Sequence, residues 1–189
     1  LEQLVVAATI VKKQQKNTGT NPLDVAYAEL KTTIKPVPKG GKVWKELEAY
    51  VENSHAPTHH FKLELVDIFE IARKGEKAKY TGFSKDIPNR ELLIHGSRMS
   101  NWCSILKQGL LLDPSRLGVY ISGKMFGYGV YFANSFSKSA QYCGTSYGKS
   151  EYACLTLAEV ALGDPLEKTS ADFYLSKAKV EGTGNHSTW

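Results

Sequence analysis

The stretch LLIHGSRMSNW, residues 92–102, decides the fold of this chain and points to its functional site. Three apolar residues run directly into His95 and Gly96, which is the pattern of a buried strand that ends on an imidazole. A helical pattern follows over 100–109, with Ser100 expected as its cap and Gly109 as its end. The stretch therefore predicts a strand end that delivers His95 to a cleft, where the bare backbone of Gly96 leaves room for a ligand.

Regular structure is predicted on both sides of this stretch. Strands are expected at 30–37, 61–71, 129–133 and 152–163, and helices at 1–16, 43–54 and 135–144. Ser135 is expected to cap the last of these helices and Gly144 to end it. Residues 109–128 and the chain after Gly163 are expected to be loops. Because strands and helices do not alternate in a βαβ rhythm, the predicted fold class is α+β with largely antiparallel pairing.

The bulk composition is that of an ordinary globular domain. The chain has 189 residues, 42% of them hydrophobic, and a net charge of +5. This charge favours acidic or phosphorylated partners, or it reflects a solvated lysine-rich surface. No stretch approaches the ~20 apolar residues of a membrane span, and the start lacks the features of a secretory signal. No membrane partner is therefore expected.

Cysteines and histidines bear on redox state and metal binding. The three cysteines are odd in number and none has C-x-x-C spacing, which favours a reducing compartment. The segment HAPTHH contains His55, His59 and His60, and a His-x3-His pair on a helix can bind zinc. Pro57 interrupts this segment and no Glu or Cys completes a site. A polar loop is expected here, and no metal site is predicted.

Three local features are expected to meet at the end of the 92–95 strand. Tyr131 lies in the strand pattern at 129–133, while Ser139 and Tyr142, three residues apart, share a face of the following helix. With His95 and Gly96 they supply an imidazole, bare backbone, two aromatic planes and a hydroxyl. A flat heteroaromatic amide fits such a slot, because tyrosines stack on its faces while backbone and hydroxyl groups bind the amide. Each feature taken alone is also compatible with an ordinary structural role.

In their order and spacing, these motifs resemble the catalytic domain of the poly(ADP-ribose) polymerases. The resemblance is carried by HGSRMSNW, FGYGVYFANSFSKSAQYC and LAEVALG, and it extends upstream through NPLDVAYAELKT, HAPTH, VDIFEI and NRELLIHGSR. It covers nearly the whole chain and is closest to the nuclear, DNA-damage-responsive members. It implies a two-sheet ADP-ribosyltransferase fold with flanking helices over 19–189, preceded at 1–18 by the end of a helical regulatory domain. It also implies a nuclear location.

The resemblance implies that NAD is the substrate and gives each residue of the constellation a role. Family members break the bond between nicotinamide and ribose, then pass ADP-ribose to an acceptor protein, the enzyme itself included, or to a growing polymer; we expect polymer. His95 and Tyr131 would be catalytic, with His95 binding the ribose hydroxyls and Tyr131 lining the nicotinamide slot. The other expected NAD contacts are Gly96 and Ser139 at the carboxamide, Tyr142 on the nicotinamide ring, Lys138 near the reacting ribose, Ser97 and Asn101 on the adenosine side, and Phe132 and Ala133 beside Tyr131.

The chain departs from the family pattern in two places. Cleavage of an N-glycosidic bond builds oxocarbenium charge, which calls for a nearby carboxylate. The family's glutamate would lie beyond Trp189, so 19–189 is expected to lack the C-terminal strands. Loss of such a charge-stabilising group can lower a rate by on the order of 100- to 1000-fold, so residues 1–189 are expected to be impaired in catalysis or inactive. Glu159 does not occupy the matching position and is expected to be a structural strand residue. Leu111 replaces an arginine of many close relatives, which is expected to loosen the grip on NAD.

A function from another class stays open at this point. The chain could be an inactive module that binds NAD or ADP-ribose, or a scaffold at damaged DNA. Retention of His95 and Tyr131 favours the enzyme, whereas the missing glutamate favours the binding module. Contact with DNA is expected only through regions outside these residues, because no recognition helix or zinc module is apparent.

Overall fold

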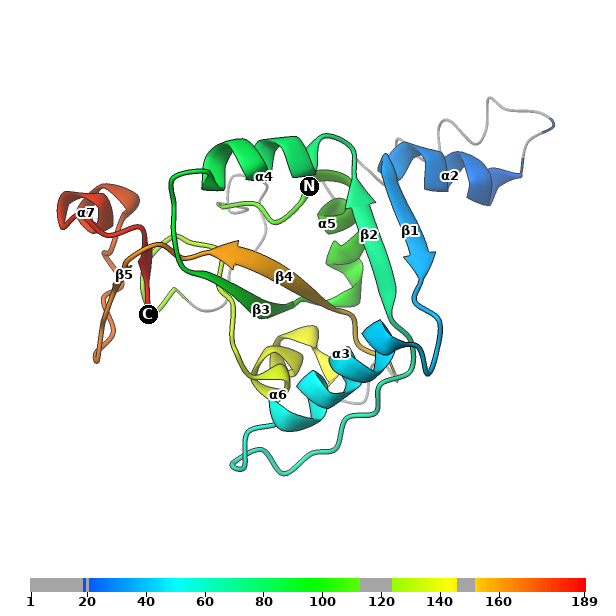
Figure 1. Ribbon diagram of the computed structural model, residues 1–189, viewed down its shortest axis with the longest axis horizontal. Helices are drawn as coiled ribbons and strands as arrows, with labels where there is room; N and C mark the ends of the chain where they lie inside the picture. Colours follow the sequence, from blue (N-terminus) through cyan, green and yellow to red (C-terminus); the bar gives the residue numbers. More distant parts are fainter. Residues whose placement is uncertain (1–18, 20, 113–123, 146–151) are drawn as a thin grey trace.

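The computed structural model describes residues 19, 21–112, 124–145 and 152–189 (Figure 1). In chain order these residues form α2 (Pro22–Leu30), β1 (Thr32–Pro36), α3 (Lys42–Asn53), β2 (Phe69–Arg73), α4 (Glu76–Ser84), β3 (Arg90–Gly96), the 3₁₀ turn η1 (Met99–Asn101), α5 (Trp102–Gln108), α6 (Phe136–Ala140), the 3₁₀ turn η3 (Gln141–Cys143), β4 (Leu155–Ala161), β5 (Pro165–Leu166), α7 (Lys177–Gly182) and β6 (Ser187–Thr188). The mixture of helices with mostly antiparallel strands confirms the predicted α+β class. The helix expected at 1–16 lies outside the described residues.

Strand β3 is the centre of the described fold. It pairs antiparallel with β4, so that His95 lies opposite Thr156. On its other edge Ile94 exchanges two backbone hydrogen bonds with Ala133, at 2.8 and 2.9 Å. Leu93 and Ile94 are almost completely buried as a result. The apolar residues that precede His95 thus anchor the strand end on which the site is built.

The remaining strands form two further pairs. Strands β1 and β2 are antiparallel, and the short strands β5 and β6 are parallel. Helix α5 packs on the β1–β2 sheet, because the Arg73 guanidinium donates to Ile105 O at 3.0 Å and the Thr32 hydroxyl donates to Leu106 O. Figure 1 shows α5 between this sheet and the β3–β4 pair, with α3 and α6 on the opposite side of β3 from α4.

Two of the predicted strands are much shorter than expected. Only the end of the 61–71 segment is a strand, because its partner β1 ends at Pro36 and the ladder closes with Val37 N–H donating to Ile68 O at 2.8 Å. The 129–133 segment contributes a single bridge at Ala133. The carbonyl of Tyr131, which a strand would use for pairing, instead accepts a hydrogen bond from an imidazole.

The predicted helix ends are mostly confirmed. Ser135 caps α6 by accepting from Lys138 N–H, while Gly109 and Gly144 end their helices in positive-φ conformations that favour glycine. Ser100 is not a cap, because a 3₁₀ turn precedes α5 and the Ser100 hydroxyl donates to Asn101 Oδ1. Helices α2 and α4 were not predicted. Asn21, which accepts from Leu23 N–H just before a proline in the first helical position, is the local signal that marks α2.

The segment after Gly163 is not entirely loop, since it contains β5, α7 and β6. It is attached to the stretch before Tyr131 at two points. Asp172 N–H donates to Met125 O at 2.8 Å, and Gly127 lies so close to Leu175 that a Cβ there would meet its carbonyl oxygen at 1.9 Å. Among the described residues, no helix is both long and apolar enough to cross a bilayer.

Candidate functional site

His95 stands at the carboxyl end of β3 with its ring orientation fixed. Its Nδ1 lies 2.7 Å from the carbonyl oxygen of Tyr131, and its ring meets the edge of Phe132 at a centroid distance of 5.8 Å. Because a carbonyl can only accept, Nδ1 carries the proton of this hydrogen bond. In the neutral imidazole, Nε2 is therefore a lone-pair acceptor. The structure thus commits Nδ1 of His95 to the backbone and leaves Nε2 as the ring nitrogen that can accept a hydrogen bond.

Tyr131 contributes to the site through its backbone and its ring rather than its hydroxyl. The hydroxyl donates to Gly127 O at 2.7 Å and accepts from Phe126 N–H at 3.0 Å, which closes the turn before the residue. The residue remains 37% exposed. What the side chain can offer to a ligand is therefore its aromatic surface.

Gly96 is a glycine for a reason that the sequence pattern does not show. It is buried, and an added Cβ would lie 1.9 Å from the carbonyl oxygen of Ser139 and 3.2 Å from Cys143 Sγ. Helix α6 fills the space that a side chain at position 96 would take. The expectation that Gly96 leaves this space for a ligand is therefore corrected. Gly96 brings the end of β3 into direct contact with the helix that carries Ser139.

Ser139 is buried between α6 and β3. The residue is 3% exposed, and its hydroxyl donates to Ile94 O at 2.9 Å. With its only proton committed to the strand, the hydroxyl can still accept a hydrogen bond from an amide NH₂ group. Tyr142 behaves differently: the helix tightens into η3 at Gln141, and the tyrosine is 48% exposed. Its ring is free to meet a ligand.

The residues expected on the adenosine side lie together in the turn after β3. Asn101 Nδ2 donates to Ser97 Oγ at 2.9 Å, and the Trp102 indole donates to Ser97 O at 3.2 Å. Lys138 is exposed on α6. Leu111 is exposed at one end of the 109–128 loop, of which residues 113–123 lie outside the described residues.

Glu159 faces away from His95. It lies opposite Leu92 in the β3–β4 ladder, three positions from His95, and side chains alternate between the two faces of a sheet. Its carboxylate accepts from the Tyr80 hydroxyl at 2.8 Å and pairs with Arg90 at 3.4 Å. Burial and the hydrogen bond to Glu159 raise the pKa of Tyr80. These contacts agree with a structural role for Glu159.

Two thiols lie beneath the strand end. Cys143 Sγ lies 3.4 Å from the carbonyl oxygen of Cys154, and burial raises the pKa of Cys143 to about 11. Burial also raises the pKa of Cys154. The thiol under Gly96 is therefore protonated at neutral pH and acts as an apolar filler.

The histidine-rich segment forms a loop against α6, as expected of a polar loop. Across the described ranges, no three His, Cys, Asp or Glu side chains gather closely enough to hold a metal ion. His55 Nε2 lies 3.0 Å from His59 O, and His59 contacts Ser137 of α6. These histidines are thus engaged in the packing of the fold.

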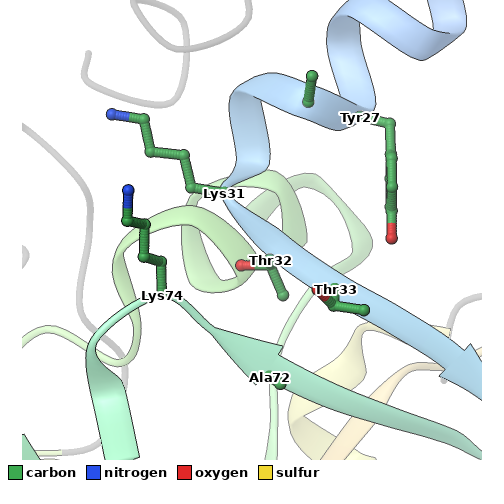
Figure 2. Close-up of a pocket in the computed structure, with 7 residues that line it drawn as sticks. Tyr27, Lys31, Thr32, Thr33, Ala72 and Lys74 are labelled. Carbon is green, nitrogen blue, oxygen red and sulfur yellow. The ribbon is translucent and has the colours of Figure 1, made fainter. Parts of the chain in front are cut away.

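A separate hollow of about 510 Å³ opens on the β1–β2 sheet. Figure 2 shows Lys31 and Lys74 projecting side by side at its rim, with Thr32 and Thr33 between them and Tyr27. None of the predicted NAD-binding residues lines it.

Several known proteins are similar to this chain in sequence. The family model described as "Poly(ADP-ribose) polymerase catalytic domain" matches residues 42–188. A "Poly [ADP-ribose] polymerase" of Sarcophaga peregrina is 42% identical over 174 residues, which cover 92% of this chain and 17% of the relative. A "Poly [ADP-ribose] polymerase 1" of Danio rerio is 42% identical over 189 residues, covering 97% and 18%. A "Poly [ADP-ribose] polymerase 2" of Homo sapiens is 40% identical over 191 residues, covering 100% and 31%. The chain thus spans less than a third of each of these relatives.

Proposed function

This chain belongs to the poly(ADP-ribose) polymerase catalytic-domain family, and from that premise we propose that the protein containing it is an NAD-dependent ADP-ribosyltransferase. It would cleave the nicotinamide–ribose bond of NAD and transfer ADP-ribose, as polymer, to acceptor proteins that include itself. One observation carries the proposal. His95 is pinned at the end of β3 by Tyr131 while α6 brings Ser139 against the same strand end.

The proposed chemistry needs NAD to be gripped at its nicotinamide and its ribose. The Ser139 hydroxyl, whose proton is given to Ile94, would accept from the carboxamide NH₂ beside the backbone of Gly96. The half-exposed ring of Tyr142 would stack on the nicotinamide. His95 would accept from a ribose hydroxyl through Nε2. The contacts of Ser97, Asn101, Phe132, Ala133 and Lys138 with the rest of NAD are part of the same proposal.

Bond cleavage in such a site requires little acid catalysis. The electron pair of the broken bond returns to the ring nitrogen, so nicotinamide leaves as a neutral molecule and the positive charge passes to the ribose. An acceptor nucleophile then attacks the ribose carbon and gives up its proton. A carboxylate would stabilise the charged ribose. Glu159 is turned to the other face of the sheet, so we propose that another residue of the full-length protein supplies this carboxylate.

The orientation of Glu159 also supports a second candidate, a module that binds NAD or ADP-ribose without cleaving it. The two candidates predict the same ligand but a different product. We further propose a nuclear protein that acts in DNA repair, supported by the resemblance to the damage-responsive members. Contact with DNA would be made by regions outside this chain.

The function is tested by nicotinamide release from NAD with the full-length protein. His95→Ala and Tyr131→Ala are expected to lower turnover by roughly 100-fold, because each displaces a group that orients the ribose or the nicotinamide. Glu159→Gln is the matched control and should leave turnover unchanged. Unchanged turnover in both site variants would reject the proposed roles. NAD binding without nicotinamide release by the unmodified protein would establish the binding module instead.

A further inference from the structure

Helix α6 is too short to be stable without contacts to the rest of the fold. It has five residues, and isolated helices this short are unstable in water. It nevertheless carries Lys138 and Ser139 and leads directly into Tyr142, three of the residues proposed to contact NAD. Whatever fixes α6 therefore fixes the nicotinamide end of the proposed site.

The helix is held on two opposite sides by two buried serines. Ser139 donates to β3, as described above. Ser137 is 0% exposed and lies two residues earlier, which places it about 200° around the helix from Ser139. On the Ser137 side lies the loop after α3, where Ser54 O accepts from Phe136 N–H at 3.1 Å. Figure 1 shows α6 lying next to α3, with β3 beyond it.

His59 joins the two ends of this short helix. Its Nδ1 lies 2.7 Å from Ser137 Oγ, and its Nε2 lies 2.8 Å from Gln141 Nε2. Because the Gln141 amide nitrogen donates to Nε2, the neutral imidazole carries its proton on Nδ1 and donates it to Ser137. Ser137 Oγ also accepts from Ala56 N–H at 2.8 Å and lies 3.2 Å from the Oγ of the cap residue Ser135.

We propose that His59 is a positioning residue for the nicotinamide end of the site, acting through its hydrogen bond to Ser137. Through this bond the histidine loop holds Ser137 of α6 in place, and so fixes the segment that carries Ser139 and Tyr142. The proposal rests on the proposed function in that NAD is taken as the ligand of this segment. It also gives the HAPTHH motif a use that requires no metal.

Two amide substitutions separate the two ring nitrogens of His59. In the full-length protein, His59→Asn places an amide group near the position of Nδ1 and retains a partner for Ser137. His59→Gln extends the amide toward the position of Nε2 and loses that partner. His60→Asn is the matched control, because His60 is exposed and makes no hydrogen bond among the described residues.

The expected result is a split between binding and turnover. His59→Gln should raise the KM for NAD and the Kd for benzamide, a nicotinamide analogue, by about 2- to 10-fold with little change in kcat, because one partly buried hydrogen bond is lost. His59→Asn and the control should stay near the unmodified protein. Equal impairment in both His59 variants, or a loss of thermal stability without a change in KM or Kd, would overturn the proposal.

Failure of the proposed function gives a different result. In that case the unmodified protein would neither bind NAD nor release nicotinamide. The positioning role is then judged by nitrogen NMR of the full-length protein labelled at histidine. A proton on His59 Nδ1 that is lost from this site in Ser137→Ala supports the hydrogen bond to α6, and a proton on Nε2 overturns it.

Discussion

Substitution of Gly96 by alanine tests whether the close approach of α6 to β3 organises the site. The new Cβ would lie 1.9 Å from the carbonyl oxygen of Ser139 and 2.8 Å from its carbonyl carbon, both of which are backbone atoms. Ordinary van der Waals contact begins at 3.4 Å, so the helix must withdraw by about 1.5 Å. A shift of this size breaks the 2.9 Å hydrogen bond from Ser139 to Ile94.

The energetic cost of Gly96→Ala has two parts. Overpacking a buried contact costs about 1–3 kcal/mol. The Ser139–Ile94 hydrogen bond, lost from a buried position, costs about 1–3 kcal/mol more. At about 2–4 °C per kcal/mol for a domain of this size, the Tm should fall by roughly 4–24 °C. Displacement of α6 from His95 by more than an ångström should also lower NAD turnover by about 100-fold.

Thermal unfolding and nicotinamide release, measured on the same preparations, check both parts. Gly82→Ala is the control, because Gly82 is exposed within α4 and an added Cβ there meets no atom within 4 Å. Its Tm should stay level or rise, since alanine in a helix interior is favoured over glycine by about 0.5–1 kcal/mol. If Gly96→Ala unfolds at the temperature of the unmodified protein and retains its turnover, the close contact does not organise the site.

Two further predictions concern titratable groups. At neutral pH, iodoacetamide should label the exposed Cys103 in the folded protein but not Cys143, because burial raises the pKa of Cys143 to about 11. Mass spectrometry measures the labelling of each cysteine. Comparable labelling of both would contradict the buried position of Cys143. The hydrogen bond from Lys168 lowers the pKa of Asp172. The ionised carboxylate therefore stabilises the fold in full above the ordinary pKa of a carboxyl group, and this stabilisation is lost as the pH falls through the lowered pKa. The Tm difference between the unmodified protein and Asp172→Asn should therefore be present at neutral pH and vanish in acid, and a difference that does not depend on pH would refute it.

Local patterns in the sequence predicted the elements that depend on local causes. Helix α3 follows the amphipathic period of its own residues, and strand β4 carries the predicted extended pattern. Gly109 and Gly144 end their helices because glycine adopts positive φ without strain. The end of β3 at His95 and Gly96 follows from the same kind of local pattern.

The remaining features depend on partners that are distant in sequence. Residues 61–67 alternate like a strand but pair with no strand of the described residues, because β1 ends at Pro36. The space beside Gly96 is filled by Ser139, which lies 43 positions further along the chain. No sequence pattern around residue 96 indicates this contact. The contact of His59 with Ser137 joins residues 78 positions apart. The residues of the candidate site could thus be proposed from the sequence, whereas the long-range contacts that hold them in position could not.

The double anchoring of α6 also has a consequence for the order of folding. The histidine loop, the end of β3 and α6 each come from a different part of the chain, and their hydrogen bonds span 78 and 45 residues. Contacts of such long range form only after large chain loops have closed, and proteins rich in them fold slowly. The proposed nicotinamide end of the site should therefore be assembled late in folding, after these chain loops have closed.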